Sequence, residues 1–129
     1  MQQQKWGRII NIASVHGLVG SKNKAAYVAA KHGLVGLTKV TAQENANDGI
    51  TVNAICPGWV ETPLINQQIN AIAERDQVDF ETAKVRLISE KQPKTTMATP
   101  EKVAELVKFV ASDMADCITG TTLPIDGGW

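Results

Sequence analysis

A tyrosine and a lysine lie four residues apart, at Tyr27 and Lys31, within a stretch whose apolar spacing predicts a helix. Residues four apart share one face of a helix, so the phenol and the ammonium should point in the same direction. Ser14 ends an apolar run typical of a buried strand, and the ends of parallel strands face a binding crevice. A hydroxyl, a phenol and an amine at one crevice could move a proton at a carbinol or carbonyl carbon. A nearby cation favours the phenolate, which is the form that accepts the proton.

The periodicity of the whole chain predicts an α/β fold that positions these groups. Strands are expected at 7–14, 50–56 and 121–125, and helices at about 24–47 and 100–112. The helix at 24–47 repeats Ala26, Ala30, Leu34, Leu37 and Thr41 at helical spacing. Right-handed crossovers would make the three strands adjacent and parallel.

Three local patterns add detail to this prediction. The segment 61–92 is polar and predicts two amphipathic helical pieces. Thr99 followed by Pro100 predicts a helix N-cap with proline at the first helical position. Gly33 and Gly36 should each cost a helix about 1 kcal/mol relative to alanine. Their presence predicts that another helix packs closely against this one.

The charge balance and the cysteines limit the function classes. Thirteen basic and thirteen acidic residues give no electrostatic footprint for nucleic acid or an anionic membrane. Cys56 and Cys117 are far apart, and the chain begins without an apolar targeting or spanning segment. We therefore expect reduced thiols in a cytoplasmic protein. No His, Cys and Asp cluster has metal-ligand spacing, so no metal site is predicted.

The second strand runs into the loop Pro57-Gly58-Trp59-Val60-Glu61-Thr62. Pro57 fixes its φ, and Gly58 allows a conformation that is barred to other residues. A loop of this shape can offer its amides to a carboxamide. The alternative is an ordinary strand-to-helix turn in which Thr62 serves as a helix cap.

Taken together, Ser14, the Tyr-x-x-x-Lys pair, the Pro-Gly-x-Val-x-Thr loop and the closing Asp-Gly-Gly resemble the short-chain dehydrogenase/reductase family. The resemblance implies a Rossmann-like doubly wound sheet, of which 1–129 would be the C-terminal half of a single domain with the last three strands. The N-terminal half would carry the Gly-rich cofactor turn, for which this sequence has no G-x-x-x-G-x-G match. The segment 61–92 would cover the substrate.

The same resemblance implies roles for individual residues. Tyr27 would be the general acid/base, Ser14 would orient the substrate oxygen, and Lys31 would tune Tyr27 and hydrogen-bond the ribose of NAD. The nicotinamide would be held by the loop, at Pro57, Gly58, Val60 and Thr62. NAD rather than NADP follows from the resemblance alone.

A further set of polar and aromatic side chains borders the same crevice: His16, Lys24, Trp59 and Gln68. A cation, an imidazole and an amide suit a small carboxylate, and an indole suits a short alkyl chain. The resemblance adds Trp129 as a substrate-binding residue, and a terminal Trp is expected to pack onto a neighbouring subunit. Taken singly, each of these residues is as readily a loop or surface residue.

This pattern resembles the members of the family that oxidise (R)-3-hydroxybutyrate to acetoacetate with NAD, so the expected partner is a small 3-hydroxy acid. The family implies a homo-oligomer, commonly a tetramer. One alternative is a reductase of another 3-oxo compound, such as a 3-oxoacyl thioester. A second is a non-catalytic packing or assembly module, because the first strand would form an apolar edge that invites pairing.

Overall fold

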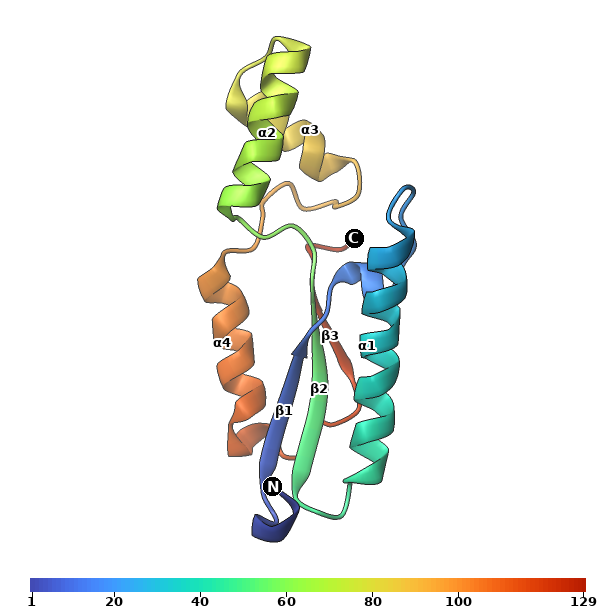
Figure 1. Cartoon of the computed structure of the whole chain (residues 1–129). Helices are drawn as coiled ribbons and strands as arrows, with labels where there is room; N and C mark the ends of the chain where they lie inside the picture. Colours follow the sequence, from blue (N-terminus) through green and yellow to red (C-terminus); the bar gives the residue numbers. More distant parts are fainter.

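The computed structural model describes all 129 residues, which form a three-stranded parallel sheet with helices on both faces (Figure 1). The strands are β1 (Gly7–Ile12), β2 (Ile50–Pro57) and β3 (Thr122–Ile125), and β2 lies in the middle. Helix α1 (Ala25–Glu44) covers one face and α4 (Pro100–Ala111) the other. The predicted α/β class and the parallel sheet are confirmed.

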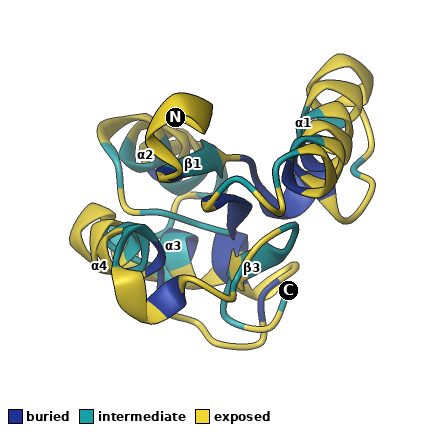
Figure 2. Cartoon of the chain, turned by 90° about the horizontal axis from the view of Figure 1, so that it is seen from below, coloured by how far each residue is buried: buried dark blue, intermediate teal, exposed yellow.

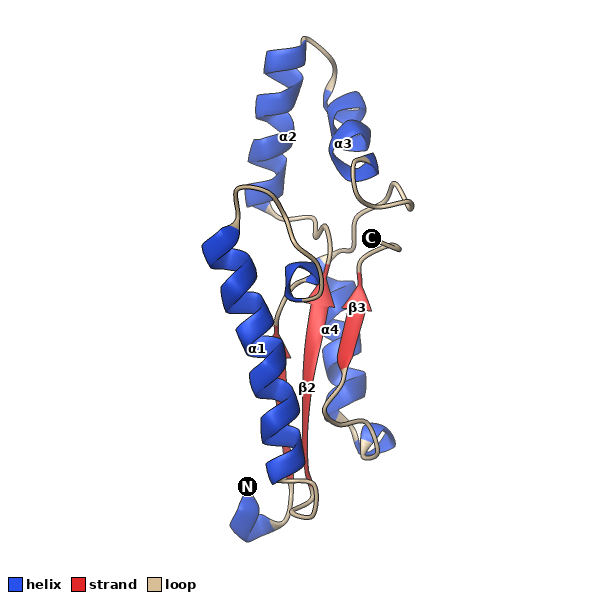
Figure 3. Ribbon diagram, turned by 90° about the vertical axis from the view of Figure 1, so that its right-hand side faces the viewer, coloured by secondary structure: helices blue, strands red, loops and turns tan.

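Helices α2 (Pro63–Asp76) and α3 (Phe80–Ser89) project beyond the carboxyl ends of the strands (Figure 3). Their bounds match the two helical pieces expected within 61–92. Both begin with a side-chain cap, from Thr62 to the Ile65 amide and from Asp79 to the Thr82 amide. None of the helices is long and apolar enough to cross a membrane.

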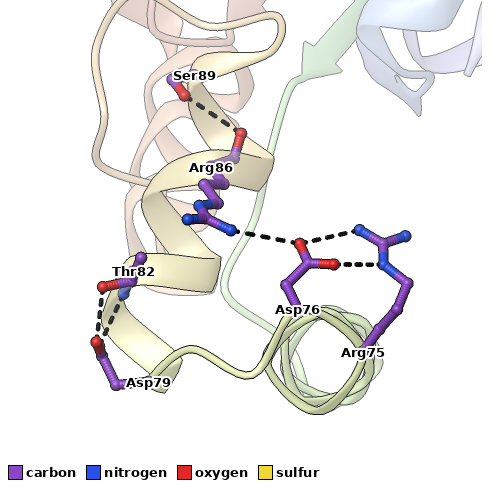
Figure 4. A network of polar contacts seen from close by, with 6 residues as sticks. All are labelled: Arg75, Asp76, Asp79, Thr82, Arg86 and Ser89. Atoms are coloured by element: carbon purple, nitrogen blue, oxygen red, sulfur yellow. Dashed lines mark hydrogen bonds and ion pairs between the residues drawn. The ribbon is translucent and has the colours of Figure 1, made fainter.

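Polar contacts join the C-terminal end of α2 to α3 (Figure 4). The Asp76 carboxylate accepts a hydrogen bond from Arg75 at 2.7 Å and pairs with Arg86 of α3 at 3.5 Å. Both arginines are exposed to solvent, so these ion pairs contribute little to stability. The joint is held mainly by the apolar cluster beneath it, which consists of Ile69, Ala83, Leu87, Ile88 and Met97.

The first strand ends two residues earlier than predicted. The Ala13 amide makes the last ladder bond to the Ile55 carbonyl at 2.8 Å, and a single 3-10 turn follows at Val15–Gly17. The Ser14 side chain caps this turn by accepting a hydrogen bond from the His16 amide. A Cβ at Gly17 would lie 2.9 Å from the Lys31 carbonyl oxygen, so the glycine allows the turn to pack directly against α1.

The face of α1 that meets the sheet differs from the predicted stripe. Its buried residues are Val35, Thr38 and Ala42, whereas Ala26, Ala30 and Leu37 are exposed. Thr38 lies on the sheet side because its hydroxyl accepts a hydrogen bond from Asn11 of β1 at 2.9 Å and donates one to the Leu34 carbonyl. The helix is therefore anchored partly by polar contacts, which hydrophobic spacing does not reveal.

The outer face of α1 is open to solvent in this chain (Figure 2). No atom lies within 4 Å of a Cβ built on Gly33 or Gly36, so the close helix contact expected there is absent within the chain. In α4, by contrast, Thr99 caps the helix and Pro100 is its first residue, as predicted. The inner face of α4 consists of Val103, Leu106, Val107 and Val110, of which Val110 is fully buried.

Strand β1 is an edge strand, because it pairs with β2 alone. Ile9 and Ile10 are partly exposed, and the Ile12 side chain at the carboxyl end is 49% exposed. The apolar edge expected from the sequence is therefore present.

Candidate active site

Ser14 lies directly after β1 and is buried. Its backbone is extended, and its Oγ accepts a hydrogen bond from the His16 amide at 3.1 Å. The same oxygen lies 3.5 Å from Nδ1 of the His16 ring. The His16 amide occupies one acceptor position of Oγ, and the hydroxyl lines the cavity described below.

Tyr27 and Lys31 point in the same direction from the first two turns of α1, as their spacing predicts. The Lys31 ammonium lies 5.7 Å from the centroid of the Tyr27 ring and donates a hydrogen bond to the Ile12 carbonyl at 3.0 Å. This bond ties α1 to the carboxyl end of β1. The Tyr27 side chain is 47% exposed, so its phenol is open to a ligand in the crevice.

A cavity of about 390 Å³ brings Ser14 and Tyr27 together with His16, Lys24, Trp59 and Gln68, whereas Lys31 and Trp129 are not part of its lining. Its lining consists of Ser14, His16, Lys24, Tyr27, Gly58, Trp59, Leu64, Ile65 and Gln68. These residues come from the end of β1, the start of α1, the loop after β2 and the first turns of α2. A volume of this size is in the range of small-molecule sites.

The His16 ring is the centre of an aromatic cluster at the wall of this cavity. Its centroid lies 5.9 Å from the Tyr27 ring and 5.2 Å from the Trp129 ring, both edge-on. Its Nε2 is buried and has no hydrogen-bond partner. Burial, reinforced by the positive charges of Lys24 and Lys91, lowers the pKa of His16 below its ordinary value of 6.5.

The C-terminal Trp129 packs within its own chain in this structure. Trp129 folds back over its own chain and lies against His16 and Trp59, the latter with ring centroids 5.5 Å apart. The reason is the closing turn, because Gly127 and Gly128 both have positive φ and reverse the chain after β3. The terminal indole thereby lines a second cavity of about 270 Å³ beside the first.

The loop after β2 approaches the C-terminal segment closely. A Cβ on Gly58 would lie 2.9 Å from the Asp126 Cα, yet the φ of Gly58 is not positive. The expectation that Gly58 adopts a conformation barred to other residues is therefore wrong, and close backbone approach is its structural role.

The same loop has unpaired backbone groups. Val60 forms a parallel bridge with Ala98, in which the bonds are made by the Trp59 carbonyl and the Glu61 amide. The amide and carbonyl of Val60 itself make no hydrogen bond within the chain. Thr62 caps α2 by accepting a hydrogen bond from the Ile65 amide at 3.4 Å, so the helix-cap reading of Thr62 is correct. A free amide and carbonyl in this loop fit the carboxamide of a nicotinamide.

Two residues of the site escaped the sequence analysis. Lys91 lines the second cavity, and Gln92 is buried beneath Gly127, where its Nε2 donates a hydrogen bond to the Thr96 carbonyl at 2.8 Å. Both follow α3, and no spacing pattern connects them with the Tyr27 region. The thiols are free, with Cys56 buried and Cys117 exposed, and no group of three or more His, Cys, Asp and Glu side chains could hold a metal ion.

Comparison with curated proteins gives relatives along the full length of the chain. The chain is 53% identical over 129 residues to D-beta-hydroxybutyrate dehydrogenase of Cupriavidus necator and 50% identical to the protein of the same name from Rhizobium meliloti. It is 41% identical over 128 residues to an acetoacetyl-CoA reductase of Shinella zoogloeoides. The alignments cover 99–100% of this chain and 48–50% of the relatives, so the chain spans about half of their length.

Solved structures give the same result. A 4-hydroxyisoleucine dehydrogenase complexed with NADH superposes with a TM-score of 0.84 at 38% identity, covering 98% of this chain and 49% of the other. An actinorhodin polyketide ketoreductase with NADPH superposes with a TM-score of 0.85 at 39% identity, covering 97% and 48%. The family model described as enoyl-(acyl carrier protein) reductase matches residues 1–129. With the Ser14, Tyr27 and Lys31 constellation at the end of a parallel sheet, these matches show that the chain belongs to the short-chain dehydrogenase/reductase family of oxidoreductases.

Proposed function

We propose that the protein to which this chain belongs oxidises (R)-3-hydroxybutyrate to acetoacetate with NAD. The observation that carries the proposal is the composition of the larger cavity, where His16, Lys24 and Gln68 line the same space as Ser14 and Tyr27. An imidazole, an ammonium and an amide beside a hydroxyl and a phenol match an acid with both a carboxylate and a carbinol. The names of the two relatives at 53% and 50% identity agree with it.

The two ends of the substrate would contact different sides of the cavity. The carboxylate would be bound by the Lys24 ammonium, with donors from His16 and Gln68. The terminal methyl group would lie against Trp59 and Leu64, which form the apolar side of the cavity. This arrangement orients C3 and its hydroxyl toward Ser14 and Tyr27.

The catalytic step follows from the positions of three side chains. The Ser14 hydroxyl donates a hydrogen bond to the substrate oxygen and holds that oxygen beside the phenol. Tyr27, as phenolate, takes the hydroxyl proton while the C3 hydrogen leaves with its electron pair. The Lys31 ammonium lies 5.7 Å from the ring centroid, where it would stabilise the negative charge that develops at the reacting oxygens. In the reverse direction Tyr27 returns the proton to the carbonyl oxygen of acetoacetate.

The residues that would hold the cofactor are Tyr27, Lys31, Pro57, Gly58, Val60 and Thr62. NAD supplies the hydride acceptor when it is bound. The free amide and carbonyl of Val60 suit its carboxamide, and Lys31 suits a ribose hydroxyl. We propose NAD rather than NADP because of the resemblance to 3-hydroxybutyrate dehydrogenases. In the same proposal, 1–129 is the C-terminal half of one dehydrogenase domain, and 61–92 is its substrate-covering segment.

A second candidate is reduction of a 3-oxoacyl thioester, favoured by the 41% identity to an acetoacetyl-CoA reductase. A thioester has no free carboxylate, so it would not require Lys24 or His16. A third candidate concerns the 129 residues alone. The free edge of β1 suits a packing module, and without a Gly-rich phosphate turn these residues should not bind NAD measurably.

The deciding experiment measures the intact mass of the purified protein together with NADH formation from (R)-3-hydroxybutyrate. A mass about twice that of these residues, with turnover of the (R) but not the (S) acid, is the expected result for the dehydrogenase. Tyr27→Phe should then lower kcat at least about 100-fold while acetoacetate still binds. Turnover of acetoacetyl-CoA but not acetoacetate would replace the proposal with the thioester reductase. A mass of 13.9 kDa without turnover would favour the packing module, and tight NAD binding by such a chain would refute it.

A further inference from the structure

The second cavity adjoins the larger one, and the two share part of their lining. Four residues line both spaces: His16, Lys24, Trp59 and Gln68. The second cavity adds Ser21, Leu87, Glu90, Lys91 and Trp129 to its lining. The groups that would bind the carboxylate of a four-carbon acid therefore do not form the end of the site. About 270 Å³ of space lies beyond them.

The charges around this second space favour an anion. Lys24 and Lys91 both line it, and neither ammonium forms an ion pair or a hydrogen bond in the structure. The His16 ring lines the same cavity, and its buried Nε2 has no partner. Both lysines act on that ring, because each contributes to its lowered pKa. Glu90 is the one acidic residue of the lining, and it is not paired with Lys91.

We propose that the second cavity is an anion subsite of the substrate site, and that Lys91 binds a carboxylate lying farther from the reacting carbon than that of 3-hydroxybutyrate. The inference rests on the proposed function and extends its substrate class. The ligands are methyl ketones and their alcohols in which one or two more methylene groups separate the carbonyl carbon from the carboxylate. Examples are 4-oxopentanoate and 5-oxohexanoate.

The lining suits such a chain. With the carbonyl group at Ser14 and Tyr27, the added methylenes would pass the His16 ring and contact Leu87 and Trp129. The carboxylate would then reach Lys91, with the Ser21 hydroxyl as a further donor. Lys24, which would bind the carboxylate of the four-carbon acid, lines both cavities and can contact ligands of either chain length.

The test uses the fluorescence of Trp59 and Trp129 in the purified protein carrying Trp6→Phe, which removes the third tryptophan. Acetoacetate and 5-oxohexanoate are titrated with NAD present, because an oxo acid and NAD are both oxidised and do not turn over. Lys91→Gln should weaken 5-oxohexanoate binding about two- to five-fold, since the Lys91 side chain is exposed, and change acetoacetate binding by less than about two-fold. Glu90→Gln should strengthen 5-oxohexanoate binding. Lys94→Gln, three residues away and outside both cavities, is the matched control and should change neither.

The outcomes separate this inference from the function on which it rests. Binding of acetoacetate without binding of 5-oxohexanoate would overturn the subsite and leave the proposed function standing. Equal weakening of both acids by Lys91→Gln would also overturn it, because the lysine would then act only as a distant charge. If neither acid binds the parent protein, both proposals fail. Circular dichroism identifies a misfolded variant. If Lys91→Gln is misfolded, Lys91→Arg replaces it and should keep the parent's ratio of 5-oxohexanoate affinity to acetoacetate affinity. A folded Lys91→Arg that loses 5-oxohexanoate binding as far as acetoacetate binding would refute the subsite.

Discussion

The imidazole of His16 lies edge-on against the indole of Trp129, with ring centroids 5.2 Å apart, and so joins the turn after the first strand to the last residue of the chain. The two residues are more than a hundred positions apart in sequence. Both rings line the second cavity, and His16 also lines the first.

Trp129→Ala should therefore affect substrate binding more than the catalytic step. The change removes an aromatic contact with His16 and with Trp59, each worth about 0.5–1.5 kcal/mol. We expect KM for the hydroxy acid to rise several-fold with a smaller change in kcat. Steady-state kinetics checks this, and Trp6→Phe, at the opposite end of the sheet, is the control. A fall in kcat at unchanged KM would contradict the assignment.

Acidification should destabilise the protein through His16. Its pKa in the folded chain lies below the ordinary value of 6.5, chiefly because of burial, so the unfolded chain binds the proton more readily. Stability is then fully present above about pH 6.5 and falls as the pH drops below that value toward the folded pKa. Urea unfolding of the parent and of His16→Gln at several pH values measures the difference. A variant with the same pH dependence as the parent would show that another group is responsible.

Gly58→Ala should disturb the loop that carries Val60. The new Cβ would lie 2.9 Å from the Asp126 Cα, and backbone on both sides leaves little room for adjustment. We expect a loss of stability of about 1–3 kcal/mol and weaker NAD binding. Gly20→Ala is the matched control, because no atom lies within 4 Å of a Cβ at that position. Thermal unfolding and an NAD titration measure both effects, and equal behaviour of the two variants would refute the close-approach role.

The sequence predicted the elements well because the strands and α4 carry strong local signals. Ile50 to Cys56 is mostly apolar and is buried throughout, and Thr99 with Pro100 starts α4 as predicted. The inner face of α1 was missed because Thr38 is held to the sheet by hydrogen bonds rather than by apolar burial.

The site shows the same division between local and long-range information. Ser14, Tyr27 and Lys31 are close in sequence, so their convergence follows from a strand, a turn and a helix. The places of Trp129 and Lys91 depend on the reversal after β3 and on the end of α3, which no local pattern specifies. Gly58 was recognised as special, but its reason, contact with Asp126, comes from a segment 68 residues later.

The exposed outer face of α1 predicts self-association. Leu37 is 57% exposed and Val40 50% exposed, and Gly33 and Gly36 beside them leave room for another backbone. A second copy packed there would bury these side chains, at about 25 cal/mol for each Å² of apolar surface. Leu37→Lys should then reduce the molar mass measured by light scattering, whereas Met114→Lys, at a side chain 85% exposed after α4 on the opposite face of the sheet, should not.

Gly33→Ala tests the same face through its effect on stability. On a free helix surface, alanine should raise the stability by about 1 kcal/mol, because glycine costs the helix that much. On a face closed by another helix, the added methyl group would clash and lower both the stability and the molar mass. A stabilised variant, together with an unchanged mass for Leu37→Lys, would mean that this face does not join copies of the protein.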